Sequence, residues 1–189
     1  MAKTWFTADL HFGHARIIEY CARPFAGLDE MHEALIDNWN ASVGDNDTVY
    51  VLGDFSWSRH DEFGRLLKGK KYLIPGNHDG CGPAKRLTYL TILPVIHKMN
   101  CQGQAFILCH YPMLSWPGSC HDSIHLFGHV HNRTEMDSEV FRYAEGKRMM
   151  NVGVDVNDFK PVSASAVLEK FQSRGVTHET ILDGVSEKS

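Results

Sequence analysis

Side chains that can bind metal ions follow directly after short apolar runs along this chain. The first run ends at Asp9 and His11, and the second ends at Asp54. The next three runs end in Asn77-His78-Asp79, in His110 and in His129-Val130-His131. Carboxylate oxygens and neutral imidazole nitrogens suit divalent manganese, iron, zinc or nickel, and no cysteine stands at these positions. The pattern therefore indicates a metal site without thiolate ligands.

Seven of these residues are candidate ligands, which is too many for one ion and fits two ions that share a bridge. They are Asp9, His11, Asp54, Asn77, His110, His129 and His131. Two ions about 3.5–4 Å apart can lower the pKa of a bridging water and clamp both oxygens of an in-line displacement. We therefore expect two divalent ions, manganese first, with iron, zinc, nickel or cobalt as alternatives.

Three glycines immediately precede candidate ligands. Gly53 precedes Asp54, Gly76 precedes Asn77, and Gly128 comes directly before His129. A missing Cβ allows a tight turn or a close approach of the backbone to a bound group. We expect these glycines to serve a tight turn or such an approach.

The apolar runs alternate with longer amphipathic stretches, which is typical of an α/β domain. The runs predict strands at 4–8, 48–52, 72–75, 105–109, 123–127 and 149–154, with further strands or edges near 94–100 and 139–143. The amphipathic stretches predict helices at about 28–43, 59–67 and 163–171. Because the carboxyl ends of strands line the ligand crevice in open α/β sheets, five segments should deliver polar groups to one rim.

Length and composition fit one domain. The chain has 189 residues, 43% of them hydrophobic, so it can bury a core without disulfides. We expect a single domain over 1–182 and a frayed tail over 183–189. The five cysteines show no CxxC spacing and indicate reduced thiols. No apolar leader or membrane-spanning stretch is present, which predicts a cytoplasmic protein.

The polar blocks, taken in order, resemble the five motif blocks of the calcineurin-like metallophosphoesterases. The resemblance covers roughly 4–131, and Asp9–Arg23 with Pro24-Phe25 looks most like the small, uncapped, single-domain members from bacteria and viruses. Each block alone is weak, but five in order, each after a strand-like run, form a specific signal. The resemblance implies a four-layer α/β (α+β) sandwich of two mixed β-sheets flanked by helices.

The resemblance also implies roles for individual residues. Asp9, His11 and His131 would hold the first metal, Asn77, His110 and His129 the second, and Asp54 both. His78 would protonate the leaving oxygen or stabilise the developing charge without binding metal. Asp79 would orient His78 through a hydrogen bond. Asn77, His78 and His14 are the expected substrate contacts.

The expected reaction is hydrolysis of phosphodiesters or phosphomonoesters by in-line attack of a metal-bridging hydroxide. The Asp-Arg-Gly extension of protein Ser/Thr phosphatases is absent after Asp54, which favours a small phosphate ester, nucleotides included, over a phosphoprotein. A net charge of −4 argues against an extended nucleic-acid groove. The alternatives are a nuclease or nucleic-acid-end phosphatase, a non-catalytic scaffold with the same fold, and a mononuclear oxygenase. We expect no membrane partner and a monomer or small homo-oligomer.

Several residues admit two interpretations from sequence. His14 faces either the substrate phosphate or solvent, and Arg16 and Arg23 either contact phosphate or lie at the surface. Asp155 and Asn157 either reach the rim or cap the following segment. His125 lies inside an apolar run and is expected to be a hydrogen-bonded core residue. The remaining histidines are expected to be structural or at the surface: His32, His60, His97, His121 and His178.

Overall fold

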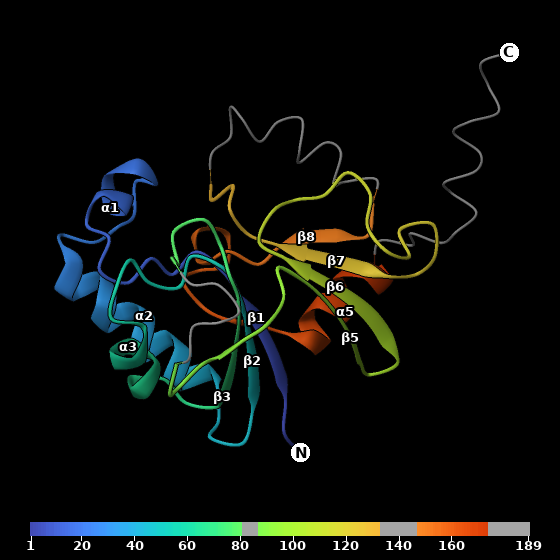
Figure 1. The fold of residues 1–189 in the computed structure, drawn as a ribbon, viewed down its shortest axis with the longest axis horizontal. Coiled ribbons are helices and arrows are strands. Elements are labelled where there is room, and N and C mark those ends of the chain that lie inside the picture. Colours follow the sequence, from blue (N-terminus) through green and yellow to red (C-terminus); the bar gives the residue numbers. More distant parts are fainter. Residues whose placement is uncertain (81–86, 133–146, 174–189) are drawn as a thin grey trace, which may run out of the picture.

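Two β-sheets packed face to face form the centre of the computed structural model, which describes residues 1–80, 87–132 and 147–173 (Figure 1). The first sheet has five strands in the order β4-β3-β2-β1-β9. They are β1 (Thr4–Thr7), β2 (Thr48–Leu52), β3 (Lys70–Ile74), β4 (Thr91–Ile92) and β9 (Val162–Ser163). The pairings from β4 to β1 are all parallel and β9 runs antiparallel to β1, so this sheet is mixed.

The second sheet has four strands in the order β5-β6-β7-β8. They are β5 (Ile96–Cys101), β6 (Gln104–Cys109), β7 (Ile124–Phe127) and β8 (Met149–Asn151). A hairpin makes β5 antiparallel to β6, whereas β6, β7 and β8 are parallel. The strands that precede the candidate ligands, β1 to β3 in the first sheet and β6 and β7 in the second, are therefore parallel within each sheet. Parallel strands place their carboxyl ends at the same edge of the sheet.

The inner faces of the two sheets share one apolar core. Phe6 of β1 packs against Phe106 of β6 with ring centroids 5.3 Å apart, and Leu52 and Leu126 belong to the same cluster. Because side chains alternate along a strand, Val49 and Val51 of β2 point to the opposite face of the first sheet. Both faces of β2 are thus buried, which fixes its register and holds the residue that follows it.

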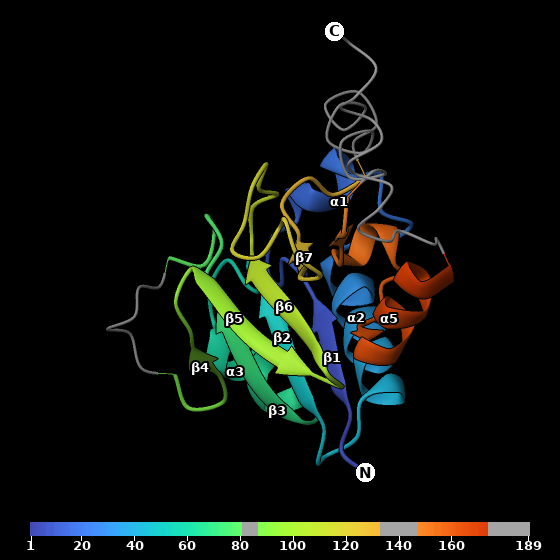
Figure 2. The same cartoon turned by 90° about the vertical axis from the view of Figure 1, so that its right-hand side faces the viewer.

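Helices cover the outer face of the first sheet and one end of the sandwich (Figures 1 and 2). They are α1 (Arg16–Tyr20), α2 (Leu28–Ser42), α3 (His60–Leu66), the 3₁₀ turn η1 (Val154–Val156) and α5 (Ala164–Ser173). Met31, Leu35 and Trp39 of α2 recur at helical spacing and pack on Val49 and Val51. On the second sheet's outer face, among the described residues, the loop carrying Trp116 packs on Ile107, Phe127 and Met149.

The architecture confirms the expected class of two mixed sheets with flanking helices. The three predicted helices and the principal strands are present within a few residues of the expected bounds. The short helix α1 and the strands β4 and β9 are additional. The strand expected near 139–143, His178 and the tail 183–189 lie outside the described residues.

Among the residues that the structure describes, no helix is long and apolar enough to cross a bilayer. The cytoplasmic location stays a prediction.

Candidate metal centre

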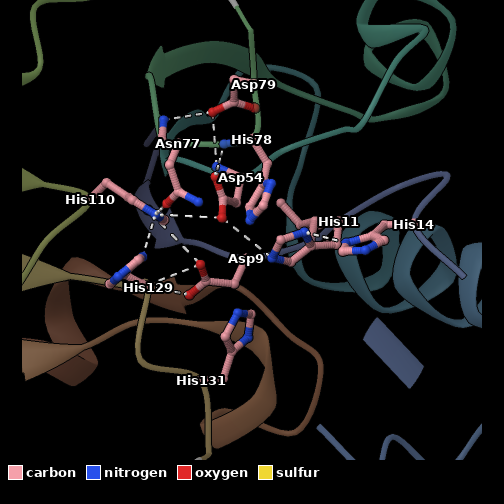
Figure 3. Close-up of polar contacts among 12 residues, drawn as sticks. Asp9, His11, His14, Asp54, Asn77, His78, Asp79, His110, His129 and His131 are labelled. Carbon is pink, nitrogen blue, oxygen red and sulfur yellow. Dashed lines mark hydrogen bonds and ion pairs between the residues drawn. The ribbon is translucent and has the colours of Figure 1, made fainter. Parts of the chain in front are cut away.

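The candidate ligands lie together at the carboxyl ends of β1, β2, β3, β6 and β7. Figure 3 shows their side chains turned toward one another from five separate segments of the chain. Two groups of carboxylate and imidazole side chains have ligand atoms within 4.8 Å of one another. One is Asp9, His11 and His131, and the other is Asp9, Asp54 and His110. The structure also brings His129 to Asp9, which lies 120 positions earlier in the chain.

One side of the centre is enclosed, and we call Asp9, His11 and His131 the buried half. Their exposed fractions are 0%, 1% and 8%. Both carboxylate oxygens of Asp9 accept a hydrogen bond from the backbone N–H of His129, at 3.0 and 2.9 Å. His11 and His131 face each other with ring centroids 5.1 Å apart.

The other side opens to solvent, and we call Asn77, His110 and His129 the open half. His110 Nε2 lies 3.0 Å from Asn77 Oδ1 and 3.2 Å from His129 Nδ1. Although His110 is buried, Asn77 is exposed and His129 is half-buried. Asp54 stands between the halves, with Oδ2 3.5 Å from both His11 Nε2 and His110 Nε2.

The donor chemistry of the two central imidazoles fits bound cations. His110 Nδ1 lies 2.8 Å from the carbonyl oxygen of Leu52, so this nitrogen donates and Nε2 keeps its lone pair. His11 Nε2 is buried and has no hydrogen-bond partner among the described residues. Since buried polar nitrogens are normally paired, this orphan indicates a ligand atom lying beside Asp54. The residues present therefore fit divalent metal ions.

Backbone strain is concentrated at the ligands. Five of them have positive φ angles that side-chain-bearing residues seldom adopt: Asp9 at 60°, His11 at 54°, Asp54 at 53°, His129 at 73° and His131 at 51°. Each costs of the order of 1–3 kcal/mol and persists only when the surroundings hold it. Left-handed residues let a strand end turn so that alternate side chains point to the same centre.

The glycines expected from sequence are required by crowding. A Cβ on Gly53 would collide with the His110 ring, and one on Gly76 would collide with the Asp54 carboxylate. A Cβ on Gly128 would lie 2.6 Å from Asp9 Oδ2. Gly153, which sequence reasoning missed, is equally confined, with Asp9 Oδ2 2.7 Å from its would-be Cβ.

Asp79 does not orient His78 as expected. Its carboxylate accepts backbone N–H bonds from Asp54 at 2.9 Å, from Phe55 at 2.8 Å and from Gly76 at 2.7 Å. These bonds fold the side chain back over its own turn, and within residues 1–80 no hydrogen bond joins it to the His78 ring. Burial opposes ionisation of Asp79, but nearby His60 and the backbone amides outweigh it and lower the pKa of this carboxyl. Asp79 therefore joins the loop of Asp54 to the loop that follows β3.

His78 and His14 are half-buried and lie beside the candidate ligands (Figure 3). The His78 backbone N–H donates to Asp54 Oδ1 at 2.9 Å, and its ring centroid is 5.5 Å from that of His11. Nδ1 of His14 lies 3.3 Å from His11 Nδ1. Trp57, which sequence reasoning missed, stacks on His78 with centroids 5.4 Å apart and is 55% exposed. Nothing in its local sequence marks it, because only the fold places it there.

Arg23 is neither a phosphate contact nor a surface residue. It is 5% exposed, and its guanidinium forms an ion pair with Asp155, with Nε 2.8 Å from Oδ1. Asp155 does reach the rim, where Oδ2 lies 2.7 Å from His131 Nδ1. Arg16 is exposed, over the Tyr20 ring.

Asn157 and His125 both have structural contacts and do not join the candidate ligands. Asn157 donates from Nδ2 to the carbonyl oxygens of Asn151 and Gly153, so it fixes a loop and does not reach the ligands. His125 is fully buried and bonded to Ile107 and Tyr111 carbonyls, as expected for a core residue.

The electrostatics differ between ligands. Burial raises the pKa of Asp9 to about 6, against the opposing charges of His131 and His110. Burial, together with the charges of His131 and Arg23, lowers the pKa of His11 well below its usual range, so this imidazole is neutral. Burial opposes protonation of His131, but hydrogen bonds to Asp155 and Cys21 and the charge of Asp9 raise its pKa to about 10. A cation at His131 must therefore displace a proton.

The sequence of this chain is similar to those of known proteins along most of its length. The family model described as calcineurin-like phosphoesterase matches residues 2–147, which include all seven candidate ligands. An uncharacterized protein of Methanocaldococcus jannaschii is 35% identical over 188 residues, covering 97% of this chain and 98% of that protein. The gene 66 protein of Mycobacterium phage L5 is 44% identical over 93 residues, covering 46% of this chain and 44% of the phage protein.

A solved structure agrees with these sequence matches. The protein of unknown function AQ665 from Aquifex aeolicus superimposes with a TM-score of 0.72 at 27% identity, covering 90% of this chain and 100% of that one. The family match spans most of the chain and supports metal-dependent hydrolysis of phosphate esters as the general class of reaction. On its sequence, its fold and its cluster of ligands, this chain belongs to the calcineurin-like phosphoesterase family.

Proposed function

We propose that this protein is a binuclear metal-dependent phosphoesterase that hydrolyses small phosphodiesters or phosphomonoesters, nucleotides among them. The observation that carries the proposal is the position of the Asp54 carboxylate. Its Oδ2 is equidistant, at 3.5 Å, from an imidazole nitrogen of the buried half and one of the open half. A carboxylate between two groups of ligands is suited to bridge two ions.

Each half supplies the ligands of one ion. Asp9, His11 and His131 would hold the first, Asn77, His110 and His129 the second, and Asp54 both. When bound, two divalent cations supply Lewis acidity and an activated water for in-line attack on phosphorus. We propose manganese first, because carboxylate, amide and imidazole groups suit it.

His78 is the proposed acid for the leaving oxygen. Its backbone is tied to Asp54, whereas its ring is half-buried and carries no metal-ligand role in the proposal. The ring lies next to that of His11 and stacks on that of Trp57, so an ester bound at the centre would lie within reach of it. General acid catalysis by such a histidine contributes roughly 10²–10⁴-fold to the rate.

One wall of the centre favours esters with a planar group. The rings of Trp57 and His14 have centroids 4.7 Å apart, and the Trp57 ring is more than half exposed. A flat heterocycle or aryl group on the substrate would stack on this indole. Nucleotides and aryl phosphates are therefore the substrates we propose to test first.

A matrix of metals and substrates tests the proposal. Metal-free protein is supplied with Mn²⁺, Ni²⁺, Co²⁺, Zn²⁺ or Mg²⁺ and assayed on a chromogenic monoester, a diester, 2′,3′-cyclic nucleotides and a labelled oligonucleotide. We expect turnover of the small esters and two ions bound for each chain. Asp54→Ala should lose both, whereas Asp45→Ala, which changes an exposed carboxylate, should keep both.

The same matrix separates the alternatives. Cleavage of the oligonucleotide with no turnover of small esters would favour a nuclease. Two bound ions with no turnover of any ester would favour a non-catalytic scaffold. One bound ion for each chain would contradict the binuclear centre.

A further inference from the structure

A buried arginine connects the turn at Asp9, in the buried half, to η1, the segment that carries Asp155. Arg23 donates from Nη2 to the carbonyl oxygen of Asp9 at 2.7 Å and from Nη1 to that of Leu10 at 3.1 Å. Its Nε and Nη2 also donate to the two oxygens of Asp155 at 2.8 and 2.9 Å. One guanidinium therefore holds the strained turn at Asp9 and a carboxylate 132 positions further along the chain.

The same carboxylate engages a ligand. Asp155 Oδ2 lies 2.7 Å from His131 Nδ1, and the side chains of Arg23 and Asp155 are 0% and 1% exposed. A carboxylate accepts only, so His131 must donate from Nδ1. Its remaining ring nitrogen, Nε2, is then the one with a lone pair for a cation.

Local structure places the partners before any ligand arrives. Helix α1 ends at Tyr20, and Ala22, two residues further on, adopts a left-handed conformation. The backbone N–H of Arg23 then donates to the carbonyl oxygen of Ile18 at 2.8 Å. This helix ending turns Arg23 inward. Asn132, next to His131, donates to the Cys21 carbonyl at 2.8 Å and so ties the same two segments together.

We propose that Arg23 and Asp155 are positioning residues that fix the tautomer and orientation of His131 and the turn at Asp9 for the metal of the buried half. The inference rests on the proposed function only for the presence of a metal there. Neither residue touches the substrate or the reacting atoms. The guanidinium fork satisfies both carboxylate oxygens, which leaves Asp155 one orientation in which to face the imidazole.

The substitution Asp155→Asn gives a sharp test because the shape of the side chain is kept. If the amide nitrogen takes the place of Oδ2, the new side chain donates to His131 Nδ1, and the imidazole then carries its hydrogen on the metal-facing nitrogen. If the amide is turned over, its nitrogen meets the Nε–H donor of Arg23. The first arrangement changes the tautomer of His131. The second keeps the tautomer but replaces the charged acceptor of its Nδ1–H by a neutral amide oxygen and leaves the Nε–H of Arg23 without an acceptor. Both weaken the hold on the imidazole, whereas an ion pair that served only stability would leave the affinity for metal unchanged.

The experiment uses the whole chain freed of metal and titrated with Mn²⁺ alone by calorimetry. The variants are Asp155→Asn, Arg23→Met and the double variant. The matched control is Asp47→Asn, another buried carboxylate with three hydrogen-bond donors, located where β2 begins and away from the ligands. Imidazole ¹⁵N shifts of the Zn²⁺-loaded protein report the His131 tautomer directly.

We expect Asp155→Asn and Arg23→Met to weaken one of the two Mn²⁺ sites by about 10–100-fold. The double variant should be no weaker than Asp155→Asn, since the two residues act through one another. The Nδ1–H signal of His131 should be present in the wild type, and the ¹⁵N shift of Nδ1 should change in Asp155→Asn, because the carboxylate acceptor is lost in either orientation of the amide. Asp47→Asn should lower the melting temperature and keep both affinities.

Wild-type Mn²⁺ affinity in Asp155→Asn would overturn the positioning role. Equal loss of affinity in Asp47→Asn would overturn it too, because the effect would then be one of general stability. Wild-type protein that binds Mn²⁺ but hydrolyses no ester would contradict the proposed function, and the titrations would still decide the positioning role.

Discussion

The two halves of the metal centre are built in opposite ways. In the buried half, Asp9, His11 and His131 are almost fully enclosed, and Arg23 and Asp155 support them from behind. In the open half, Asn77 is exposed and the described contacts of its oxygen are with another candidate ligand. A rigid, dry half can hold an ion between turnovers, whereas an accessible half can admit an ester. Under the proposed function, the buried half would retain its ion and the open half would admit the substrate.

The largest effect that would sharpen this comparison is expected at His78. His78→Ala should keep both ions and lower kcat by about 10²–10⁴-fold on an ester with a poor leaving group, because the acid is lost. An ester with a good leaving group should be affected far less. Steady-state kinetics on the two esters, with metal content measured in parallel, check this. Equal losses on both substrates would remove the role of acid.

Next, Asn77→Ala should weaken the ion of the open half alone. The side chain is exposed, so its removal leaves no cavity, and the folded state should keep its melting temperature when metal-free. We expect one of two Mn²⁺ affinities to fall about tenfold or more, since even partners that only orient a ligand contribute that much. Calorimetric titration measures it. Weakening of both ions together would break the distinction between the halves.

A smaller effect, on stability, is expected when the buried half is overfilled. Gly153→Ala places a methyl group 2.7 Å from Asp9 Oδ2 and 3.0 Å from Asn151 Oδ1. Overpacking of this kind costs about 1–3 kcal/mol of unfolding free energy. Gly44→Ala is the control, because the nearest atom to its would-be Cβ lies 3.6 Å away, at ordinary van der Waals distance. Urea unfolding measures the free energy of unfolding of both variants. Equal values would show that the buried half can rearrange to accept the added methyl group.

The smallest effect is expected at Asp47, remote from both halves. Backbone N–H bonds from Lys3 and Gly44, with the indole of Trp5, hold the pKa of this carboxyl below its usual value. Its contribution to stability is complete above the unfolded pKa, near about 4, and is lost as the pH falls through the lower folded pKa. Asp47→Asn should lower the free energy of unfolding by roughly 1 kcal/mol at neutral pH. It should also make the loss of stability at acidic pH less steep. Melting curves recorded from strongly acidic to neutral pH check this.

Many of the candidate ligands could be predicted from their positions along the sequence. Asp9, Asp54 and His110 come directly after apolar runs, and parallel strands bring such positions to a common edge. The need for glycine at Gly53, Gly76 and Gly128 was also expected, but as a tight turn or an approach to a bound group, whereas the crowding atoms belong to protein side chains and backbone.

What local pattern missed depends on distant partners. Arg23 and Asp155 are ordinary charged residues in sequence, and only their pairing across the fold makes both buried. The role expected for Asp79 was wrong because its turn curls tightly enough for backbone amides to take both oxygens. Trp57 likewise acquires its place over His78 from the packing of two loops.

The 120 positions between Asp9 and His129 have a consequence for biogenesis. Contacts of such long range form late, because a large loop of chain must close before they repay its entropy. A nascent chain in which β7 has not yet been synthesised contains neither His129 nor His131. Under the proposed function, metal binding would therefore require a chain whose second sheet has docked, and a prematurely ended product would lack two candidate ligands.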